Sequence, residues 1–554
     1  MRNYFPKIFL YILGLFFLLN LLQAWSTQLI FDEAYYWYYA REISWGYFDH
    51  PPMVAWLIAL GQLFFEGELG VRFLSCILGI GTMAVLWLLV DDPKKKDYIP
   101  HFFVLIASMT LVHAYGFLML PDTPLLFFTA LFFLVYKRFL ASPGVQTAIL
   151  LGLVMAALMY SKYHAFLVIF FVFLSNPGLI RERHAWLAVL ISLTAYSPHL
   201  MWLYDNHFVS VRYHLFERPN RPYEFFDFTA GYFINLIAIF GLTFYWIYRA
   251  TFKTPSRDLF TKALLFVSIG ILLFFFISSF QRRVQTQWII VICIPMAVLA
   301  YRYMLNHESA RKWIFRMGLV NICILMFLRI GLVFEPLFPV VYETHGNRTW
   351  VKKITSRAGD IPVVFENSYR MAPMFEFYTG IPSFSLNNAW YRENQYSIDA
   401  SENRVRNKKV LYVSRYLPGG DISFTMPDST LFYGVYMDPF RSYRKLRTEI
   451  IDMTGTEAGE RFAFEVRNPY SFGVPISELK FGLETLDRYK QILKVIPLTV
   501  VPGETPLPLL PPGARITLFA NFPSDLEEEA AFVKVVISEN GLRWGLNGKR
   551  KAIE

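Results

Sequence analysis

Two adjacent carboxylates, Asp32 and Glu33, directly follow the first apolar segment of the chain. They begin a stretch crowded with aromatic residues, FDEAYYWYYAREISWGYFDHPPMVAW, at residues 31–56. Another acid, Asp122 in LPDTPLLFF, stands where a later apolar segment begins. Carboxylates at the edges of apolar segments are functional hypotheses by default, and a carboxylate can remove a proton from a reacting hydroxyl group. The simpler interpretation is that these acids are only solvated.

Basic residues form the complementary pattern. Lys162 lies in the turn YSKYHAF, and Arg282 and Arg283 lie in SSFQRRVQTQW, in each case at the end of an apolar segment. Lysine and arginine bind phosphate through charge-assisted hydrogen bonds. The alternative is that these long side chains only reach the lipid headgroups. Acids and bases around one aqueous face indicate a site that holds an anionic phosphate and positions a neutral hydroxyl.

The elements that position these residues are membrane-spanning helices. The segment from Ile8 to Trp25 is too long for the core of a signal peptide and lacks a small-residue cleavage site, so it predicts a retained first helix. Ten further apolar runs bring the expected number to about eleven: 70–90, 100–119, 122–140, 145–160, 163–175, 185–204, 229–249, 261–280, 286–305 and 313–334.

Loop charges predict the orientation of these helices. Most basic residues of the loops, among them Arg2, Lys7 and those at 94–96, fall on the side of the N-terminus, which the positive-inside rule places in the cytoplasm. An odd number of spans then places the C-terminus outside.

Composition excludes several classes of protein. Of the 554 residues, 55% are hydrophobic and only 17% are charged, against roughly 25% charged in soluble domains. The 54 Phe, 33 Tyr and 13 Trp argue against disorder. The net charge of +10 does not indicate nucleic acid, because the basic residues fall mostly in short loops. Three cysteines, all in apolar runs, provide neither a disulfide framework nor a metal motif.

The apolar runs stop near Phe338, which divides the chain into a transmembrane domain (1–338) and a region of soluble composition. Residues 339–457 contain IPVVF and VLYVS on either side of a polar-aromatic stretch, a strand–helix–strand pattern typical of an α/β unit. Residues 458–554 contain short alternating strands between Pro- and Gly-rich turns, as in a β-sandwich. The expected fold class is a polytopic α-helical membrane protein with an extracytoplasmic α/β and β-sandwich region.

Taken in order, these motifs resemble the C-type membrane glycosyltransferases. The motifs are the early acidic pair, the aromatic loop ending in HPP, PDTPLLFF, SKYHAF and RVQTQW. The resemblance is nearest to the bacterial branch related to protein O-mannosyltransferases and to the aminoarabinose transferase of lipid A (glycosyltransferase family 39), and covers about residues 1–340. It implies that Asp32, in the catalytic outer loop 31–68, lies at the active site with Glu33 as its neighbour. Relatives often have proline after the residue matching Trp288, whereas here Ile289 follows, so the start of that helix stays open.

The resemblance also implies the reaction. A sugar carried on polyprenyl phosphate would be transferred with inversion to a lipid, glycan or protein acceptor on the outer, periplasmic face of a bacterial cytoplasmic (inner) membrane. Lys162, Arg282 and Arg283 would bind the donor phosphate. No cofactor is expected.

Three further residues are expected in the substrate pocket: Tyr35, His50 and Asp122. Aromatic neighbours of Tyr35 could cover a sugar ring, although packing on the bilayer surface is the simpler use for most of them. His50 beside Asp49 falls short of the three or four ligands of a zinc site, so a structural role is favoured and no metal is assigned.

Two other classes of function stay open at this point. A multi-spanning lipid or solute transporter fits the composition, although the internal repeats common in transporters are not visible. A non-enzymatic polysaccharide-binding membrane protein would account for the β-sandwich but not for the membrane charges.

Overall fold

The computed structural model describes residues 4–453, 459–501 and 509–553 and divides the chain into two units. Unit 1 consists of residues 1–208 and 223–345, and unit 2 of residues 209–222 and 346–554. Arg2 and the expected domain boundary at 457/458 fall outside the described residues.

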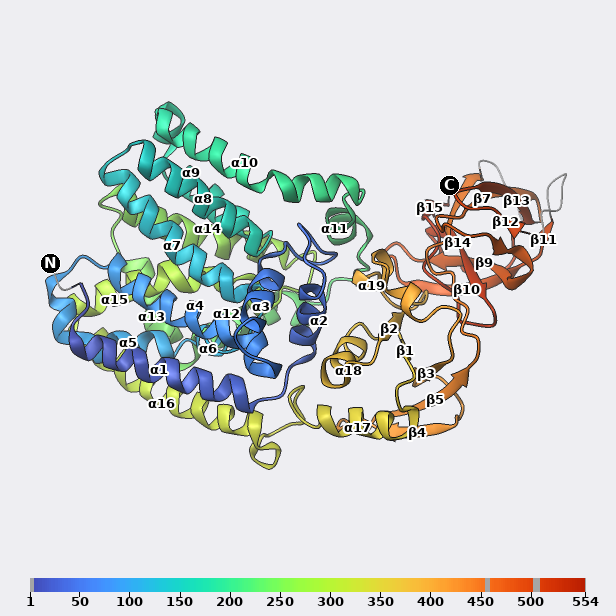
Figure 1. The fold of residues 1–554 in the computed structure, drawn as a ribbon. Helices are drawn as coiled ribbons and strands as arrows, with labels where there is room; N and C mark the ends of the chain where they lie inside the picture. The colour runs from blue at the N-terminus through green and yellow to red at the C-terminus, as the bar shows by residue number, and fades with distance from the viewer. Residues whose placement is uncertain (1–3, 454–458, 502–508, 554) are drawn as a thin grey trace. The chain divides into compact units, whose positions relative to one another are not determined.

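Unit 1 is helical (Figure 1). In the described part of the chain, seven helical segments are long and apolar enough to cross a membrane. They are α1 (Lys7–Ser26), α4 (Gly67–Leu89), α7 (Asp122–Ala141), α10 (Arg183–Asp205), the segment Phe226–Lys253 that contains α12 (Gly231–Phe240) and α13 (Phe244–Lys253), α14 (Leu259–Ser278) and α16 (Glu308–Val333). Shorter helices are α2 (Phe31–Ala40), α3 (Met53–Gln62), α5 (Ile99–Ala107), α6 (Thr110–Ala114), α8 (Val145–Ser161), α9 (Ala165–Ser175) and α15 (Cys293–Asn306). The predicted polytopic helical fold is confirmed.

Two of the expected spans are interrupted, and one side chain lies at both breaks. The run 100–119 divides into α5 and α6 at Ser108, whose carbonyl oxygen accepts a hydrogen bond of 2.5 Å from Asn321 Nδ2. The run 229–249 divides at Gly241, where φ is +55° and a Cβ would lie 2.4 Å from the Asn321 amide. Asn321 on α16 therefore satisfies one break and occupies the space at the other.

The stretch predicted as an outer loop is largely helical. Residues 31–40 form α2, and Pro52 is the N-cap of α3, a placement that suits proline's fixed φ and missing N–H. Further along the chain, residues 286–292 form two 3₁₀ turns, so α15 begins at Cys293 rather than near Trp288.

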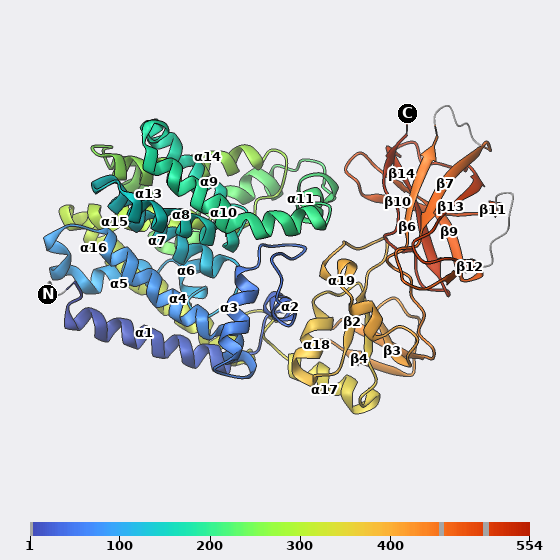
Figure 2. The same cartoon turned by 45° about the horizontal axis from the view of Figure 1, so that its top comes forward.

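Helices α7, α8 and α10 pack in succession, and both views show α8 beside α7 and α10 (Figure 2). The approach of α8 to α10 requires a small residue. A Cβ at Gly152 would lie 2.5 Å from the carbonyl oxygen of Ala188, and small residues are what allow close packing of membrane helices. Helix α8 ends at Ser161, directly before Lys162.

Unit 2 begins with a five-stranded mixed sheet of order β2-β1-β3-β5-β4. Its strands are β1 (Val363–Glu366), β2 (Ser383–Leu386), β3 (Val410–Ser414), β4 (Ile422–Thr425) and β5 (Leu431–Met437). β1 pairs in parallel with β2 and β3, while β5 is antiparallel to β3 and β4. Helices of this unit are α11 (Val209–Arg212), α17 (Asn347–Ala358), α18 (Met371–Thr379) and α19 (Gln395–Ile398).

The second part of unit 2 contains two four-stranded sheets, with orders β10-β9-β14-β15 and β11-β13-β7-β6, and a small β12-β8 pair. The strands are β6 (Arg447–Asp452), β7 (Arg461–Arg467), β8 (Val474–Pro475), β9 (Leu479–Leu486), β10 (Ile492–Leu498), β11 (Val500–Val501), β12 (Leu509–Leu510), β13 (Arg515–Asn521), β14 (Phe532–Glu539) and β15 (Lys551–Ala552). Phe464, Leu483 and Val535 from both four-stranded sheets share one buried core, as expected for a sandwich.

Candidate active site

The two adjacent acids of α2 have different environments. Asp32 is partly exposed, whereas Glu33 is fully buried, because neighbouring positions on a helix face directions about 100° apart. The Glu33 carboxylate accepts hydrogen bonds from the backbone N–H of Ile30 (3.2 Å) and of Met119 (2.9 Å). It thereby caps its own helix and ties α2 to the segment before α7.

Arg72 on α4 completes the environment of Glu33. Its Nε lies 2.7 Å from Glu33 Oε1, its Nη2 pairs with Glu33 Oε2, and both side chains are fully buried. The same guanidinium donates to the carbonyl oxygens of Ala24 (3.2 Å), Thr27 (2.6 Å) and Gln28 (3.0 Å). Arg72 therefore fastens the end of α1 and the start of α2 to α4.

Asp122 and Lys162, separated by forty residues, form a second buried ion pair. Lys162 Nζ lies 2.7 Å from Asp122 Oδ1, and each side chain is 5% exposed. Among the described residues, the Lys162 ammonium donates one hydrogen bond, to Asp122. Since an ammonium has three N–H donors, Lys162 retains donors for a further anion.

These pairs belong to one neighbourhood. Glu33 accepts a hydrogen bond from the backbone N–H of Met119, three residues before Asp122. The structure thus brings Glu33, the neighbour of Asp32 in the chain, to the segment that leads to Asp122 and its partner Lys162. The sequence presented these residues as separate motifs.

The segment with Arg282 and Arg283 approaches the Lys162 turn through its aromatic end. The ring of Trp288 stacks on His164, with the ring centroids 5.7 Å apart. Arg283 is exposed and Arg282 half-buried. The contact between His164 and Trp288 joins the two predicted phosphate-binding segments, while a phosphate-binding role for the arginines stays a prediction.

Tyr35 and Asp49 hold the turn between α2 and α3. The hydroxyls of Tyr35 and Tyr39 donate to Asp49 Oδ2 at 3.1 and 3.3 Å, and Tyr36 packs edge-on against the His50 ring at 5.6 Å. Burial, together with the nearby Tyr35 and Asp49, raises the pKa of the Tyr39 hydroxyl. These contacts stabilise the turn, and a substrate contact of Tyr35 or His50 stays a prediction.

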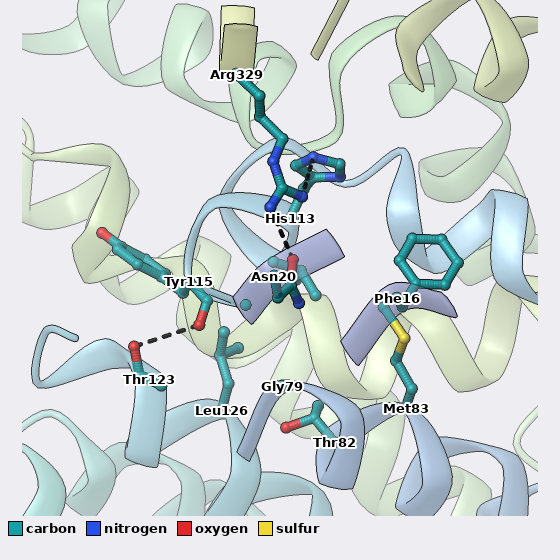
Figure 3. A pocket seen from close by; sticks show the side chains of 12 residues that line it. Phe16, Asn20, Gly79, Thr82, Met83, His113, Tyr115, Thr123, Leu126 and Arg329 are labelled. Carbon is teal, nitrogen blue, oxygen red and sulfur yellow. Dashed lines mark hydrogen bonds between the residues drawn. The ribbon is translucent and has the colours of Figure 1, made fainter. Parts of the chain in front are cut away.

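A small cavity of about 20 Å³ lies among α1, α4, α7 and α16 (Figure 3). Its volume suits one water molecule. Arg329 borders it and contacts three polar side chains, Asn20 Oδ1 (3.0 Å), Gln23 Oε1 (3.2 Å) and His113 Nε2 (3.3 Å). A buried arginine with such partners fastens α16 to α1.

The His, Cys, Asp and Glu side chains of the described residues are dispersed with respect to metal binding. Across residues 4–453, 459–501 and 509–553, no three or more His, Cys, Asp or Glu side chains gather as a metal site requires. The expectation that the protein needs no metal stays a prediction.

Known proteins share this architecture. ArnT from Cupriavidus metallidurans matches in its apo state with a TM-score of 0.54 and 13% identity, over 73% of this chain and 92% of ArnT. ArnT bound to undecaprenyl phosphate matches with a TM-score of 0.55 and 13% identity, over 74% and 93%. This is the C-type glycosyltransferase fold. The fold that the sequence resemblance implied is therefore confirmed.

Sequence comparison agrees with the C-type fold. Residues 49–202 match the family described as dolichyl-phosphate-mannose-protein mannosyltransferase, a segment that contains Arg72, Asp122 and Lys162 and begins after Asp32. The lipid A galacturonosyltransferase RgtD of Rhizobium johnstonii is 22% identical over 291 residues, which is 50% of this chain and 60% of RgtD. The chain thus covers less than two thirds of that relative's length.

Arg72 is the residue of this site that sequence reasoning missed. It lies inside an apolar run, GVRFLSCILG, where a single arginine resembles an interfacial lysine or arginine. A charge within a spanning helix needs a partner, and Glu33, predicted only as the neighbour of Asp32, was an acid that could have been considered for that pairing. That rule was the available signal.

Proposed function

We propose that this protein is an integral-membrane glycosyltransferase that moves a sugar from a polyprenyl-phosphate donor to a lipid acceptor. The observation that carries the proposal is a partly exposed carboxylate, Asp32, next to the buried Glu33–Arg72 pair, with the buried Asp122–Lys162 pair at the end of the segment that Glu33 binds. The C-type fold and the similarity to a lipid A galacturonosyltransferase support it. A transporter does not need this arrangement.

In the proposed reaction, the acceptor oxygen forms a bond to the anomeric carbon while the bond from that carbon to the phosphate oxygen breaks. The phosphate leaves with the bonding electrons, and attack from the opposite side inverts the centre. For a hydroxyl acceptor, Asp32 takes the proton, a contribution of about 10²–10⁴-fold in rate. For a phosphate acceptor, which is already anionic, Asp32 orients the acceptor instead.

The leaving phosphate gains negative charge, which fixed cations stabilise where it develops. Lys162 is the candidate held in place by an ion pair, and Arg282 and Arg283 are the candidates on the neighbouring segment. Glu33 has a positioning role, since its carboxylate is occupied by Arg72 and two backbone N–H groups. We place the reaction on the periplasmic side of a bacterial inner membrane, in keeping with the loop charges.

The test compares glycolipids, surface glycans and glycoproteins by mass spectrometry in cells that lack the protein and carry wild type, Asp32→Asn or the control Asp91→Asn. Asp91 is 72% exposed and pairs with Lys137, so its variant should behave as wild type. A sugar restored by wild type and by Asp91→Asn, but not by an equally expressed Asp32→Asn, supports the proposal. If no glycan changes despite verified expression, transfer is rejected and transport becomes the better hypothesis.

A further inference from the structure

The parallel strands of unit 2 place three loops at one edge of the sheet. In the order β2-β1-β3, the chain leaves β1 toward β2 on one side, whereas β3 lies on the other side of β1. The loops that follow β1 and β3 therefore run in opposite directions from the carboxyl ends of these two strands. In open α/β sheets, ligands bind at the carboxyl ends of the strands where the strand order reverses in this way.

Polar side chains at this edge bind one another. Asn388, after β2, donates to Glu366 Oε1 at the end of β1 (2.6 Å), and Ser414 at the end of β3 donates to the other Glu366 oxygen. Asn367 Nδ2 donates to Asn388 Oδ1 (2.7 Å). The three strand ends are thus connected through the buried carboxylate of Glu366.

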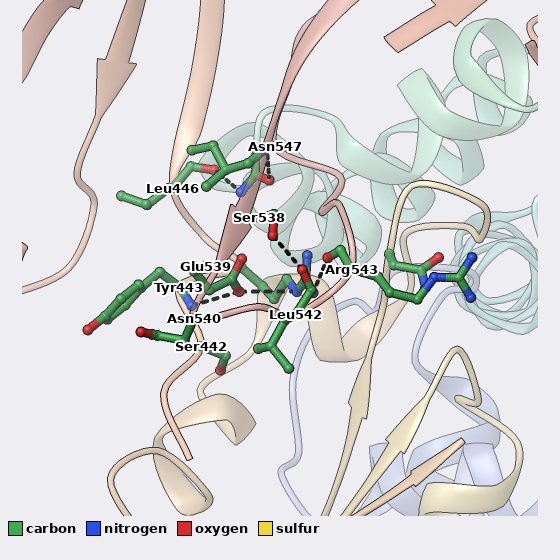
Figure 4. Close-up of polar contacts among 12 residues, drawn as sticks. Ser442, Tyr443, Leu446, Ser538, Glu539, Asn540, Leu542, Arg543 and Asn547 are labelled. Carbon is green, nitrogen blue, oxygen red and sulfur yellow. Dashed lines mark hydrogen bonds and ion pairs between the residues drawn. The ribbon is translucent and has the colours of Figure 1, made fainter. Parts of the chain in front are cut away.

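The sandwich supplies a cation to the same edge. Arg543 lies in the turn that follows β14. Two hydrogen bonds hold this turn: Arg444 donates to the carbonyl oxygen of Arg543 (2.6 Å), and Ser538 donates to the carbonyl oxygen of Leu542 (2.5 Å). Figure 4 shows the Arg543 side chain extending away from this hydrogen-bonded cluster. Its Nη1 lies 3.4 Å from Glu366 Oε1.

Two exposed aromatic rings flank Arg543. The guanidinium carbon lies 4.9 Å from the ring centroid of Trp390 and 4.5 Å from that of Tyr416, and these residues are 46% and 50% exposed. Arg415 also lies over the Tyr416 ring, at 4.8 Å. In the described part of the chain, Arg543 uses only Nη1 for a side-chain hydrogen bond within the protein, so the other donors of its fork are available.

We propose that this edge, formed by Trp390, Tyr416, Arg543 and the Glu366–Asn388 pair, binds an anionic saccharide. Exposed Trp and Tyr rings offer apolar faces to the C–H face of a pyranose, while the buried Glu366–Asn388 pair holds Arg543 at this edge. The planar fork of arginine matches a carboxylate or phosphate. A nucleotide is disfavoured because the loop after β1, NSYR, has none of the glycines that cradle a pyrophosphate.

This site lies in unit 2 and is independent of catalysis, so its test measures binding. The full chain in lipid nanodiscs is titrated with glucuronate, glucose, glucose 6-phosphate and inorganic phosphate in ligand-observed NMR. The expected result is binding of both charged sugars in preference to glucose and to phosphate. A stronger response to glucuronate than to glucose 6-phosphate would identify a carboxylate as the preferred anion, and the reverse a phosphate ester.

Variants assign the binding to this edge. Arg543→Gln should weaken binding of the charged sugars about tenfold or more, the usual cost of losing a hydrogen bond to a charged group. Trp390→Ala should weaken both charged sugars, while Arg441→Gln, which changes an exposed arginine paired with Glu478, should not. Equal binding of glucose and glucuronate, equal binding of inorganic phosphate, no binding of any probe, or equal effects of the two arginine variants would each overturn the proposal.

Discussion

Replacing Arg72 by methionine should disrupt the candidate active site without touching substrate. The change removes the partner of the fully buried Glu33 and leaves the carbonyl oxygens of Ala24, Thr27 and Gln28 without their guanidinium donor. Breaking a buried pair by removing one partner costs about 3–5 kcal/mol. The two backbone N–H groups that bind Glu33 persist, so we expect a loss near the lower end, about 3 kcal/mol.

The assay is a double-mutant cycle. Thermal unfolding and sugar transfer are measured in detergent for wild type, Arg72→Met, Glu33→Gln and the double variant. We expect the double variant to be less destabilised than the sum of the single changes by about 2–3 kcal/mol, because it leaves no unpaired charge in the interior. Lys549→Met is the control, since Lys549 and Glu449 are 72% and 56% exposed and such pairs contribute about 0–1 kcal/mol.

Transfer provides the second readout. If the pair positions Asp32, Arg72→Met lowers kcat even at temperatures where the variant is folded, because a small displacement of a catalytic group can cost about 10²-fold. Additive effects of the two single changes on unfolding, or a folded Arg72→Met variant with wild-type kcat, would refute this reasoning.

Two more predictions concern the phosphate cations and unit 2. Arg283→Gln should raise the KM for donor with little loss of thermal stability, whereas Lys162→Met should raise the KM and also lower the Tm, because it leaves Asp122 buried without its partner; equal stability losses in the two variants would contradict this. Burial, partly offset by Arg444, raises the pKa of Glu539 above its ordinary value of 4.5. The contribution of protonated Glu539 to folding stability is therefore complete below pH 4.5 and is lost as pH rises through the folded pKa. Over that pH range the Tm of Glu539→Gln should increase relative to the Tm of wild type. A difference in Tm that does not change with pH would argue against this prediction.

Apolar length and turn residues were sufficient to predict the helical unit, because a spanning helix must satisfy its own backbone hydrogen bonds. They could not predict the breaks at Ser108 and Gly241, where the contacting side chain, Asn321, is distant in sequence. Strands β2 and β4 were missed for a similar reason. Each has four residues, too few for an alternating pattern to stand out, and pairing with neighbours stabilises them.

For the candidate site, the sequence predicted the acids and bases but not their pairing. Asp122 and Lys162 were assigned separately, to a substrate pocket and to phosphate binding, yet they form one ion pair. Residue type and distance along the chain cannot distinguish a free lysine from one that a distant aspartate holds. The packing of α7 against α8 makes that distinction.

This pairing changes which cations a phosphate would require. Arg72 is matched by Glu33, and Lys162 by Asp122, so each buried pair carries no net charge. A donor phosphate placed there would bring negative charge into a region whose two cations are already balanced.

Lys162 can still donate hydrogen bonds and fix the orientation of the phosphate, but neutralising the charge that develops on the leaving group needs a further cation. Arg283, exposed on the segment that reaches the Lys162 turn through Trp288, is the candidate that we propose for that purpose, with Arg282 on the same segment. The two predicted phosphate-binding segments would then divide the work, with Lys162 positioning the phosphate and Arg283 stabilising its charge.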